Sequence, residues 1–484
     1  MKNIKKQKSL KMNAIMNSIL TMSSFIFPVI TFPYASRVLT PIGIGKVSFA
    51  ISFISYFSMI AQLGIPTYGI RVCAQNRDNR EELTQVVYEL LFINMVTNVI
   101  SYIGLFFAIY TIPRLQNDKL LYIIVACTIF LSSIGVEWLY KALEQYTYIT
   151  VRSIIFKIVS LIALFLLVHT QNDYIIYGVI TIFASSASNI LNFLNIRKFI
   201  DLRKVANYNI KRHLKPVFVF FAMACATTIY TNLDTVMLGF MKTDADVGYY
   251  NAAVKIKNIL VSIVTSLGAV LLPRTSYYVE HGKYGEFRKI SSKTLQFVCF
   301  LAVPTMVYFG LFSKEGILLI SGQSYQQAVL PMQILMPTVL FIGITNILGI
   351  QILVPLKKEK AVLLSEIVGA IVDVTLNLIF IPCYGVAGAA IGTLTAEFSV
   401  LIVQYTIVQR TIDNFSFCKG MSKYLFITIV SSGICFFIKL LELSVLLSLL
   451  ASASIFGTCY CLGLLLCKDE IINEILVFLK IKRK

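Results

Sequence analysis

The sequence predicts an all-α polytopic membrane protein with about 14 transmembrane helices. Of its 484 residues, 57% are hydrophobic and only 14% are charged, and the mean hydropathy is +0.77. Apolar runs of about 20 residues or more recur along the whole chain. A soluble core could not bury so much apolar surface, whereas a bilayer requires runs of this length.

Hydropathy and the positions of Gly and Pro set the expected spans. The first follows the basic segment "MKNIKKQKSLK", and at about 27 residues it is too long for the apolar region of a signal peptide, so we expect it to be retained. The tenth is long enough to contain a break near Pro331 or Pro337. The expected spans are 13–39, 46–69, 84–110, 119–141, 149–169, 174–198, 214–240, 247–273, 290–312, 326–355, 360–381, 386–409, 421–441 and 443–467.

The charges give this topology an orientation. The chain has 43 Lys and Arg residues and a net charge of +19, and most of the basic residues fall in alternate short loops. Because such loops stay on the cytoplasmic side, both termini are predicted to be cytoplasmic. The basic residues are spread loop by loop and form no single patch, which argues against nucleic acid as a partner.

Cysteine and histidine patterns predict neither a metal site nor a cofactor. The ten cysteines lie almost entirely inside expected spans and show no CxxC spacing, and the three histidines are scattered. A disulfide framework is equally disfavoured by this arrangement. No GxxxxGK[ST] segment occurs, which argues against intrinsic use of ATP.

Two of the expected helices share one design. The two segments are "GIGKVSFAISFISYFSMIAQLGIP" for the second and "VGYYNAAVKIKNILVSIVTSLGAVLLP" for the eighth. Each opens with a glycine followed by a small-residue pair and reaches a second glycine about 20 residues later (Gly45 to Gly64 and Gly248 to Gly268). Each then reaches a proline before a basic loop. This match predicts two six-helix lobes as parallel pseudo-repeats, and such halves usually hold a substrate between them. The predicted domains are an N-lobe (1–205), a C-lobe (206–415) and a C-terminal helix pair with a basic tail (416–484). Chance recurrence of Gly and Pro is the alternative.

Charged residues inside the spans are candidates for function. Asp234 is expected about 9 Å from the outer end of the seventh span and Lys255 about 12 Å into the eighth, at 1.5 Å per residue. A structural salt bridge between them is one interpretation. Lys257 favours a functional one, because two residues correspond to about 200° around a helix and Asp234 cannot easily neutralise both lysines.

Other spans carry polar side chains at helical spacing. For the neutral ones, hydrogen bonding between helices is the simpler explanation. Asp373 and Glu397 are expected near mid-depth. For these two acids, lining a cavity or exchanging a proton is about as well supported as pairing across helices. Asn377 lies on the same helix face as Asp373. The stripes comprise Glu366, Asp373 and Asn377; Thr393, Glu397 and Gln404; Asn94 and Asn98; and Ser185, Ser188, Asn192 and Asn195.

Four segments, in this order, carry a family resemblance. They are "FPYASRVLTPIGIGKVSFAISF" with "LGIPTYGIRVCA", then "GVEWLYKALEQYTYI", "NLDTVMLGFMKTDADVGYYNAAVKI" and "IPCYGVAGAAIGTLTAEF". Together they resemble the bacterial polysaccharide biosynthesis proteins, the O-antigen and capsular repeat-unit flippases of the multidrug/oligosaccharidyl-lipid/polysaccharide exporter superfamily. Carried over by position, the resemblance implies substrate-binding roles for Arg37, Arg71, Asp234, Lys255 and Lys257.

The resemblance implies a transporter, not an enzyme, in the bacterial plasma membrane. Its cargo would be an undecaprenyl-pyrophosphate-linked oligosaccharide for O-antigen, capsule or exopolysaccharide, with membrane lipids and a polysaccharide polymerase as partners. Moving two negative charges outward is downhill by about 4 to 5 kcal/mol at 100 mV. A cationic cavity therefore favours this cargo over the alternative, a cation-coupled drug antiporter of the same superfamily. Asp373 and Glu397 leave it open whether transport is coupled to the movement of a proton or a sodium ion. A membrane glycosyltransferase is disfavoured because the expected outer loops are short.

Overall fold

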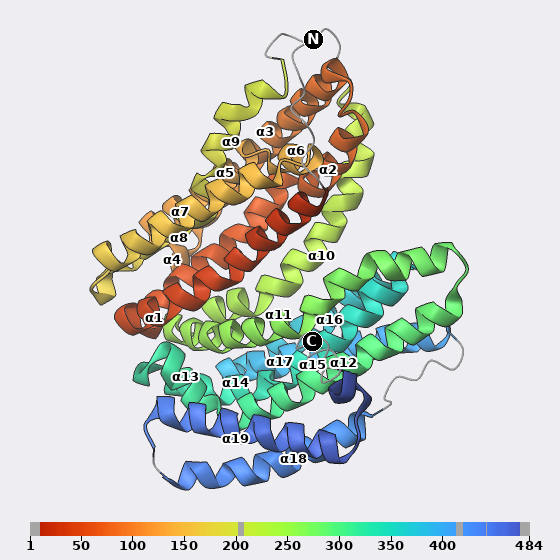
Figure 1. Ribbon diagram of the computed structural model, residues 1–484. Coiled ribbons are helices and arrows are strands. Elements are labelled where there is room, and N and C mark those ends of the chain that lie inside the picture. Colours follow the sequence, from red (N-terminus) through yellow and green to blue (C-terminus); the bar gives the residue numbers. More distant parts are fainter. Residues whose placement is uncertain (1–9, 202–207, 413–419, 442, 475–484) are drawn as a thin grey trace. The chain divides into compact units, whose positions relative to one another are not determined.

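The structure is a computed structural model that describes residues 10–201, 208–412, 420–441 and 443–474. These residues form helices and no β-strand (Figure 1). The predicted fold class, an all-α polytopic membrane protein, is therefore confirmed. The chain forms two compact units, residues 1–248 and 249–484, and helix α11 (Asp244–Glu280) begins in the first and continues in the second.

The N-terminal unit is built around α1, which packs against α3, α5, α7, α8 and α10. A buried apolar cluster, including Leu90, Leu139 and Tyr140, joins α3 and α6 to their neighbours. The helices of this unit are α1 (Leu10–Gln62), α2 (Ile65–Gln75), α3 (Arg80–Thr111), α4 (Pro113–Gln116), α5 (Lys119–Ile134), α6 (Glu137–Ala142), α7 (Tyr146–Leu167), α8 (Tyr174–Ile182), the π-helix η2 (Phe183–Ala187), α9 (Asn189–Asn195) and α10 (Lys211–Met241).

Helix α1 contains the first expected span and most of the second, whose last residues lie in α2. It runs for 53 residues and bends at Thr40, whose φ of 59° and ψ of 177° are not helical. The next residue, Pro41, has no backbone N–H to continue the hydrogen-bond ladder, which explains why the bend lies here. The first span and most of the second thus share one kinked helix.

Glycines allow the first turn of α11 to pack directly on α1. A side chain at Gly45 would collide with the backbone of Asp244, and one at Gly248 would collide with the backbone of Pro41. These are the opening glycines of the two helices whose shared design suggested a repeat. In this position the absence of a Cβ permits close contact between the two backbones.

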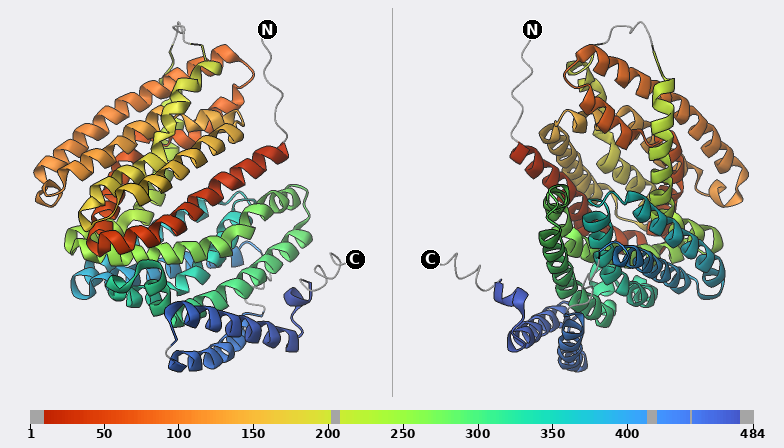
Figure 2. Two further views of the ribbon diagram at one scale, coloured as in Figure 1. Left: turned by 60° about the vertical axis from the view of Figure 1, so that its left-hand side comes forward. Right: turned by 90° about the vertical axis from the view of Figure 1, so that its right-hand side faces the viewer.

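The C-terminal unit contains one tightly paired hairpin, α16 with α17, and a peripheral pair, α18 with α19. Helices α18 and α19 lie side by side in both views of Figure 2, and they pack on α12 and α13. Buried Tyr308, Phe312 and Phe456 fill that contact. The helices are α12 (Tyr284–Leu311), α13 (Ser313–Ser321), α14 (Val329–Leu335), α15 (Pro337–Asn346), the π-helix η5 (Ile347–Leu353), α16 (Glu359–Tyr384), α17 (Val386–Gln409), α18 (Met421–Phe436) and α19 (Val445–Leu466).

The expected break in the tenth span is confirmed. Residues Gln323–Leu335 and Pro337–Leu353 form two helical segments bent by 46°. The bend falls immediately before Pro337, one of the two prolines named from the sequence, and proline cannot donate the hydrogen bond that would continue the first segment.

The described residues contain 11 helices long and apolar enough to span a membrane, or up to 12 if the bent pair is one span. The expected count of 14 is therefore not confirmed. The first expected span and most of the second are combined in α1, and α11, which holds the eighth, is not among the counted helices. The predicted domain boundaries, at 205/206 and 415/416, lie outside the described residues and stay predictions.

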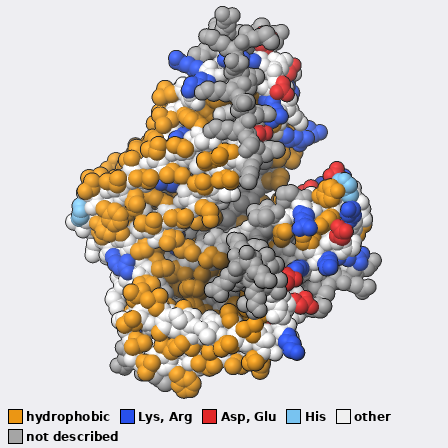
Figure 3. All heavy atoms as spheres, viewed as in Figure 1, with side chains coloured by type: hydrophobic (Ala, Val, Ile, Leu, Met, Phe, Trp, Pro, Cys, Tyr) orange, Lys and Arg blue, Asp and Glu red, His pale blue; other side chains and the backbone are white. Residues whose placement is uncertain are grey.

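The outward faces of the helices match a hydrocarbon environment. Met95, Ile103 and Phe107 on α3 are each about two-thirds exposed or more, at 71%, 66% and 70%. Figure 3 shows hydrophobic side chains over much of the N-terminal unit, with charged side chains gathered towards its upper end in that view. A belt of exposed apolar side chains is expected where lipid replaces water.

Candidate functional site

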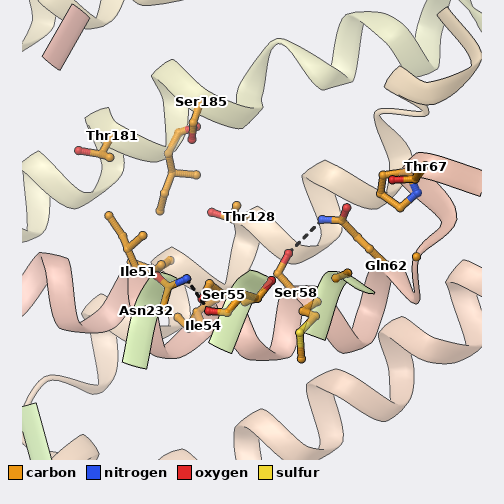
Figure 4. Close-up of a pocket in the computed structure, with 17 residues that line it drawn as sticks. Ile51, Ile54, Ser55, Ser58, Gln62, Thr67, Thr128, Thr181, Ser185 and Asn232 are labelled. Atoms are coloured by element: carbon orange, nitrogen blue, oxygen red, sulfur yellow. Dashed lines mark hydrogen bonds between the residues drawn. The ribbon is translucent and has the colours of Figure 1, made fainter. Parts of the chain in front are cut away.

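The N-terminal unit contains a cavity of about 440 Å³ whose lining combines hydroxyl and amide side chains with apolar ones and includes no charged residue. Residues from α1, α2, α5, α8, η2 and α10 form its walls. In Figure 4, Thr181 and Ser185 lie on one side, Ser55, Ser58 and Asn232 on the other, and Thr128 between them. The polar lining residues are Ser55, Ser58, Gln62, Thr67, Thr128, Thr181, Ser185, Thr228 and Asn232.

One wall of the cavity depends on the break between α1 and α2. Gly64 has a left-handed φ of 73° and precedes α2, which has proline at its start. A Cβ at Gly64 would lie 2.5 Å from the backbone nitrogen of Phe221 on α10. Both the backbone conformation and the close approach therefore require glycine here, and together they place Gln62 and Thr67 near α10.

The opposite wall contains the π-helix η2, which continues α8. A π-turn adds a residue to a helix and is frequent at functional sites, because it changes the direction of the side chains that follow. Thr181 precedes this turn and Ser185 lies within it, and both line the cavity. Of the stripe that the sequence indicated in this span, Ser185 is thus the cavity residue.

No charged side chain is among the cavity's lining residues. Several charged groups of this unit form ion pairs away from the cavity. Lys46 Nζ lies 2.9 Å from Asp118 Oδ1, and Arg114 pairs with Asp244. Burial raises the pKa of the Asp244 carboxyl, and the charges of Arg114 and Lys46 oppose that rise.

A second charged cluster, which the sequence did not single out, centres on Glu89. This carboxylate is fully buried and lies 2.7 Å from both an Arg212 guanidinium nitrogen and His213 Nε2. Its other oxygen accepts from the backbone N–H of Asn209 at 2.6 Å. The cluster fixes the start of α10 against α3. The sequence did contain a signal for this cluster. Glu89 is an acid inside an expected span, and the segment "IKRHLK" supplies basic residues that could pair with it.

The neutral polar stripes of the N-terminal unit form hydrogen bonds between helices, as the simpler explanation predicted. Asn98 Nδ2 donates to Ser133 Oγ at 2.8 Å, and Asn192 Nδ2 donates to the carbonyl of Gly135 at 2.7 Å. Ser188 accepts from Arg152, whose guanidinium also pairs with Glu137 at 3.5 Å. These contacts hold helices together in a medium that offers no other partners.

Three of the predicted substrate-binding residues lie in the N-terminal unit, and none of them lines the cavity. Arg37 is exposed on α1 and donates to the carbonyl of Pro33 at 2.7 Å. Arg71 is exposed on α2. Asp234 is buried in α10, with 8% of its surface exposed. Their roles stay predictions.

The other two, Lys255 and Lys257, lie on α11 in the C-terminal unit. Lys257 is 8% exposed and Lys255 is partly buried. Neither forms a salt bridge with a described residue of that unit. Charged groups at membrane depth normally pair with one another. The two ammonium groups are therefore unusual, because neither has an acid beside it in the described part of this unit.

Two of the polar side chains predicted on α16 are in contact with each other, and α17 packs closely against them. Asn377 Nδ2 donates to Asp373 Oδ1 at 3.2 Å, and both residues are buried. A Cβ at Gly392 would lie 3.1 Å from Asp373 Oδ1, so α17 packs directly against this carboxylate. Glu397 is 7% exposed on the same helix. Among the described residues, no group of three or more His, Cys, Asp and Glu side chains is placed to hold a metal ion.

The helices present apolar faces outward, one cavity carries hydroxyl and amide groups, and cations and carboxylates lie inside apolar helices. These features are typical of a polytopic membrane transport protein. The chain belongs to the polysaccharide biosynthesis protein family, whose model matches residues 10–279. A second model, MatE, matches residues 220–379.

Relatives in other organisms match along most of their length. The chain is 24% identical to a putative O-antigen transporter of Escherichia coli K12 over 406 residues, which cover 83% of this chain and 97% of the relative. It is 26% identical over 411 residues to a putative O-antigen transporter of Shigella dysenteriae, covering 82% and 99%. Among solved structures, the lipid II flippase MurJ in an inward closed conformation matches with a TM-score of 0.77 at 18% identity, covering 94% of this chain and all of that one.

Proposed function

We propose that this protein is a flippase that moves undecaprenyl-pyrophosphate-linked oligosaccharide units from the inner to the outer leaflet for surface polysaccharide assembly. One observation carries this proposal: the chain is similar, over almost their entire length, to proteins named as O-antigen transporters. The cargo would be an O-antigen, capsule or exopolysaccharide repeat unit. Its sugars and charged head group lose their hydration if they cross hydrocarbon unaided, so the protein must replace those contacts.

The cations of α11 are suited to the pyrophosphate. Lys255 and Lys257 have no acidic partner among the described residues of their unit, so their donors can be used by an anionic ligand. A charge-assisted hydrogen bond to phosphate is roughly twice as strong as a neutral one. Arg37, Arg71 and Asp234, which the family resemblance implies, are the other proposed substrate-binding residues.

The carboxylates of α16 and α17 are proposed to line the cavity or to couple transport to an ion. Asp373 and Asn377 are in hydrogen-bond contact, and Glu397 is buried on the facing helix. Outward movement of two negative charges is downhill by about 4 to 5 kcal/mol at 100 mV, so transport without coupling is energetically sufficient.

We place the protein in the bacterial plasma membrane with both termini in the cytoplasm. The two predicted lobes would rock to expose the cargo first to the inner and then to the outer side. The polyprenyl chain would stay in lipid, and a polysaccharide polymerase would receive the product.

Deletion of the gene tests the proposal. We expect lipid-linked repeat units to accumulate on the inner leaflet and surface polysaccharide to be lost, with both defects reversed by the wild-type gene. Normal surface polysaccharide in the deletion strain would reject the proposal. The match of the MatE model to residues 220–379 favours a drug antiporter as the second candidate, and lost drug tolerance with intact polysaccharide would select it.

A further inference from the structure

Hydrogen bonds within the helices of the N-terminal unit determine which atoms the cavity lining offers to a ligand. Several lining hydroxyls lie close to backbone carbonyls of their own helix and donate their hydrogen there. Ser55 Oγ is 2.7 Å from the carbonyl oxygen of Ser52, Thr181 Oγ1 is 2.8 Å from that of Tyr177, and Ser185 Oγ is 3.2 Å from that of Ile182. Each of these oxygens keeps its lone pairs for a ligand.

The two amides of the lining are arranged in the same way. Asn232 Nδ2 donates to the carbonyl of Thr228 and to Thr231 Oγ1, both at 3.1 Å, so both amide hydrogens are used and Oδ1 presents an acceptor. Gln62 Nε2 donates to Ser58 Oγ at 3.1 Å, which leaves its carbonyl oxygen as an acceptor. Figure 4 shows both amide contacts at the edge of the cavity.

We infer that this cavity is a subsite for the glycan of the cargo and that it selects neutral, hydroxyl-rich sugars over acidic ones; this inference rests on the proposed function. A sugar hydroxyl is a donor and satisfies a lone pair of the lining. A carboxylate or phosphate carries a full negative charge, and neutral hydroxyls and amides replace its hydration only in part. The lining contains no cation to compensate.

The size of the cavity is consistent with this role. Its volume of about 440 Å³ lies within the range of about 300–1,000 Å³ that is typical of small-molecule sites. The apolar residues among its walls, such as Ile51, Ile54 and Val125, offer surface for the C–H faces of sugar rings.

Binding of three short-chain polyprenyl pyrophosphates to the purified full-length protein in detergent, measured by calorimetry, tests the inference. One probe carries no sugar, one carries a neutral disaccharide, and one carries the same disaccharide with a glucuronic acid ring. We expect the neutral disaccharide to increase affinity at least about 10-fold over the bare pyrophosphate, because several hydrogen bonds of about 0.5–1.5 kcal/mol are added. The acidic disaccharide should give no such increase.

Matched variants locate the effect. Thr181→Val and Thr228→Val remove a lining hydroxyl at nearly constant volume, and each should reduce affinity for the neutral disaccharide about 2- to 10-fold while affinity for the bare pyrophosphate is unchanged. Thr227→Val is the control, because Thr227 is an exposed neighbour on the same helix that does not line the cavity. Gln62→Lys should raise affinity for the acidic disaccharide.

The outcomes separate the two proposals. If no probe binds the wild-type protein, both the flippase function and the subsite are rejected. If the bare pyrophosphate binds but the wild-type protein prefers the acidic disaccharide, or the lining variants behave like Thr227→Val, only the subsite is rejected.

Discussion

The N-terminal and C-terminal units hold polar groups among apolar helices in different ways. In the N-terminal unit the polar groups that line the cavity are hydroxyls and amides, and Arg152, Arg212 and Lys46 each have an acidic partner. In the C-terminal unit Lys257 is buried, and neither it nor Lys255 forms a salt bridge with a described residue of that unit. Paired charges fix helices to one another, whereas cations without a paired acid are available to a ligand. If the proposed function holds, the glycan and the pyrophosphate would be recognised by separate sets of residues.

The largest effect is expected from removing both cations of α11. The double variant Lys255→Ala with Lys257→Ala should reduce transport about 100-fold or more, because each charge-assisted hydrogen bond contributes about 1.5–3 kcal/mol. The readout is surface polysaccharide and inner-leaflet intermediates in a deletion strain. The double Arg variant, which keeps the charges, should retain more activity. Equal failure of the Ala and Arg variants would indicate that the lysines act through packing.

The next largest effect should come from breaking a paired charge. Glu89→Ala leaves Arg212 and His213 without their carboxylate, and we expect a loss of about 3 kcal/mol in the free energy of unfolding. Thermal unfolding of the protein in detergent measures it. The preference among glycan probes should be unchanged in the protein that remains folded. An altered preference would show that the paired charges also take part in recognition.

A smaller effect is expected at the break between α1 and α2. Gly64→Ala places a Cβ against the backbone of Phe221 and strains a left-handed residue, which should cost about 1–3 kcal/mol. Gly433→Ala is the control, because nothing lies within 4 Å of a Cβ there. Unchanged stability of Gly64→Ala in the same unfolding assay would contradict the close approach of α2 to α10.

The smallest effect should follow from breaking an exposed pair. Arg80 and Asp201 form a 2.9 Å salt bridge with both side chains about half exposed. Arg80→Ala should therefore change the free energy of unfolding by less than about 1 kcal/mol. A loss as large as that of Glu89→Ala would mean that burial does not determine which ion pairs stabilise this unit.

Several structural features could be anticipated because they depend on local chemistry. Apolar runs predicted the helices, and proline predicted the break before Pro337. The spacing of Asp373 and Asn377 placed them on one face, where they are in contact. The kink at Thr40 was not anticipated as a bend inside one helix, since the loop expected there and a kink have the same Gly and Pro signature.

The cavity could not be predicted from sequence patterns. Ser55, Thr181 and Asn232 lie on three different helices, and serine, threonine and asparagine inside spans usually just bond to neighbouring helices, as Asn98 and Asn192 do. Which of them border an open space depends on how helices distant in the sequence pack.

The sequence by itself determined that this is a helical membrane protein and that it carries charged residues inside its spans, because hydropathy and charge are properties of short segments. Only the tertiary structure decided which of those charges are paired and which hydroxyls share a cavity. The physical reason is that Glu89 pairs with Arg212, and Thr181 lies opposite Asn232 across the cavity (Figure 4). These residues are far apart in the sequence, so a pattern in a short segment cannot show that they come together.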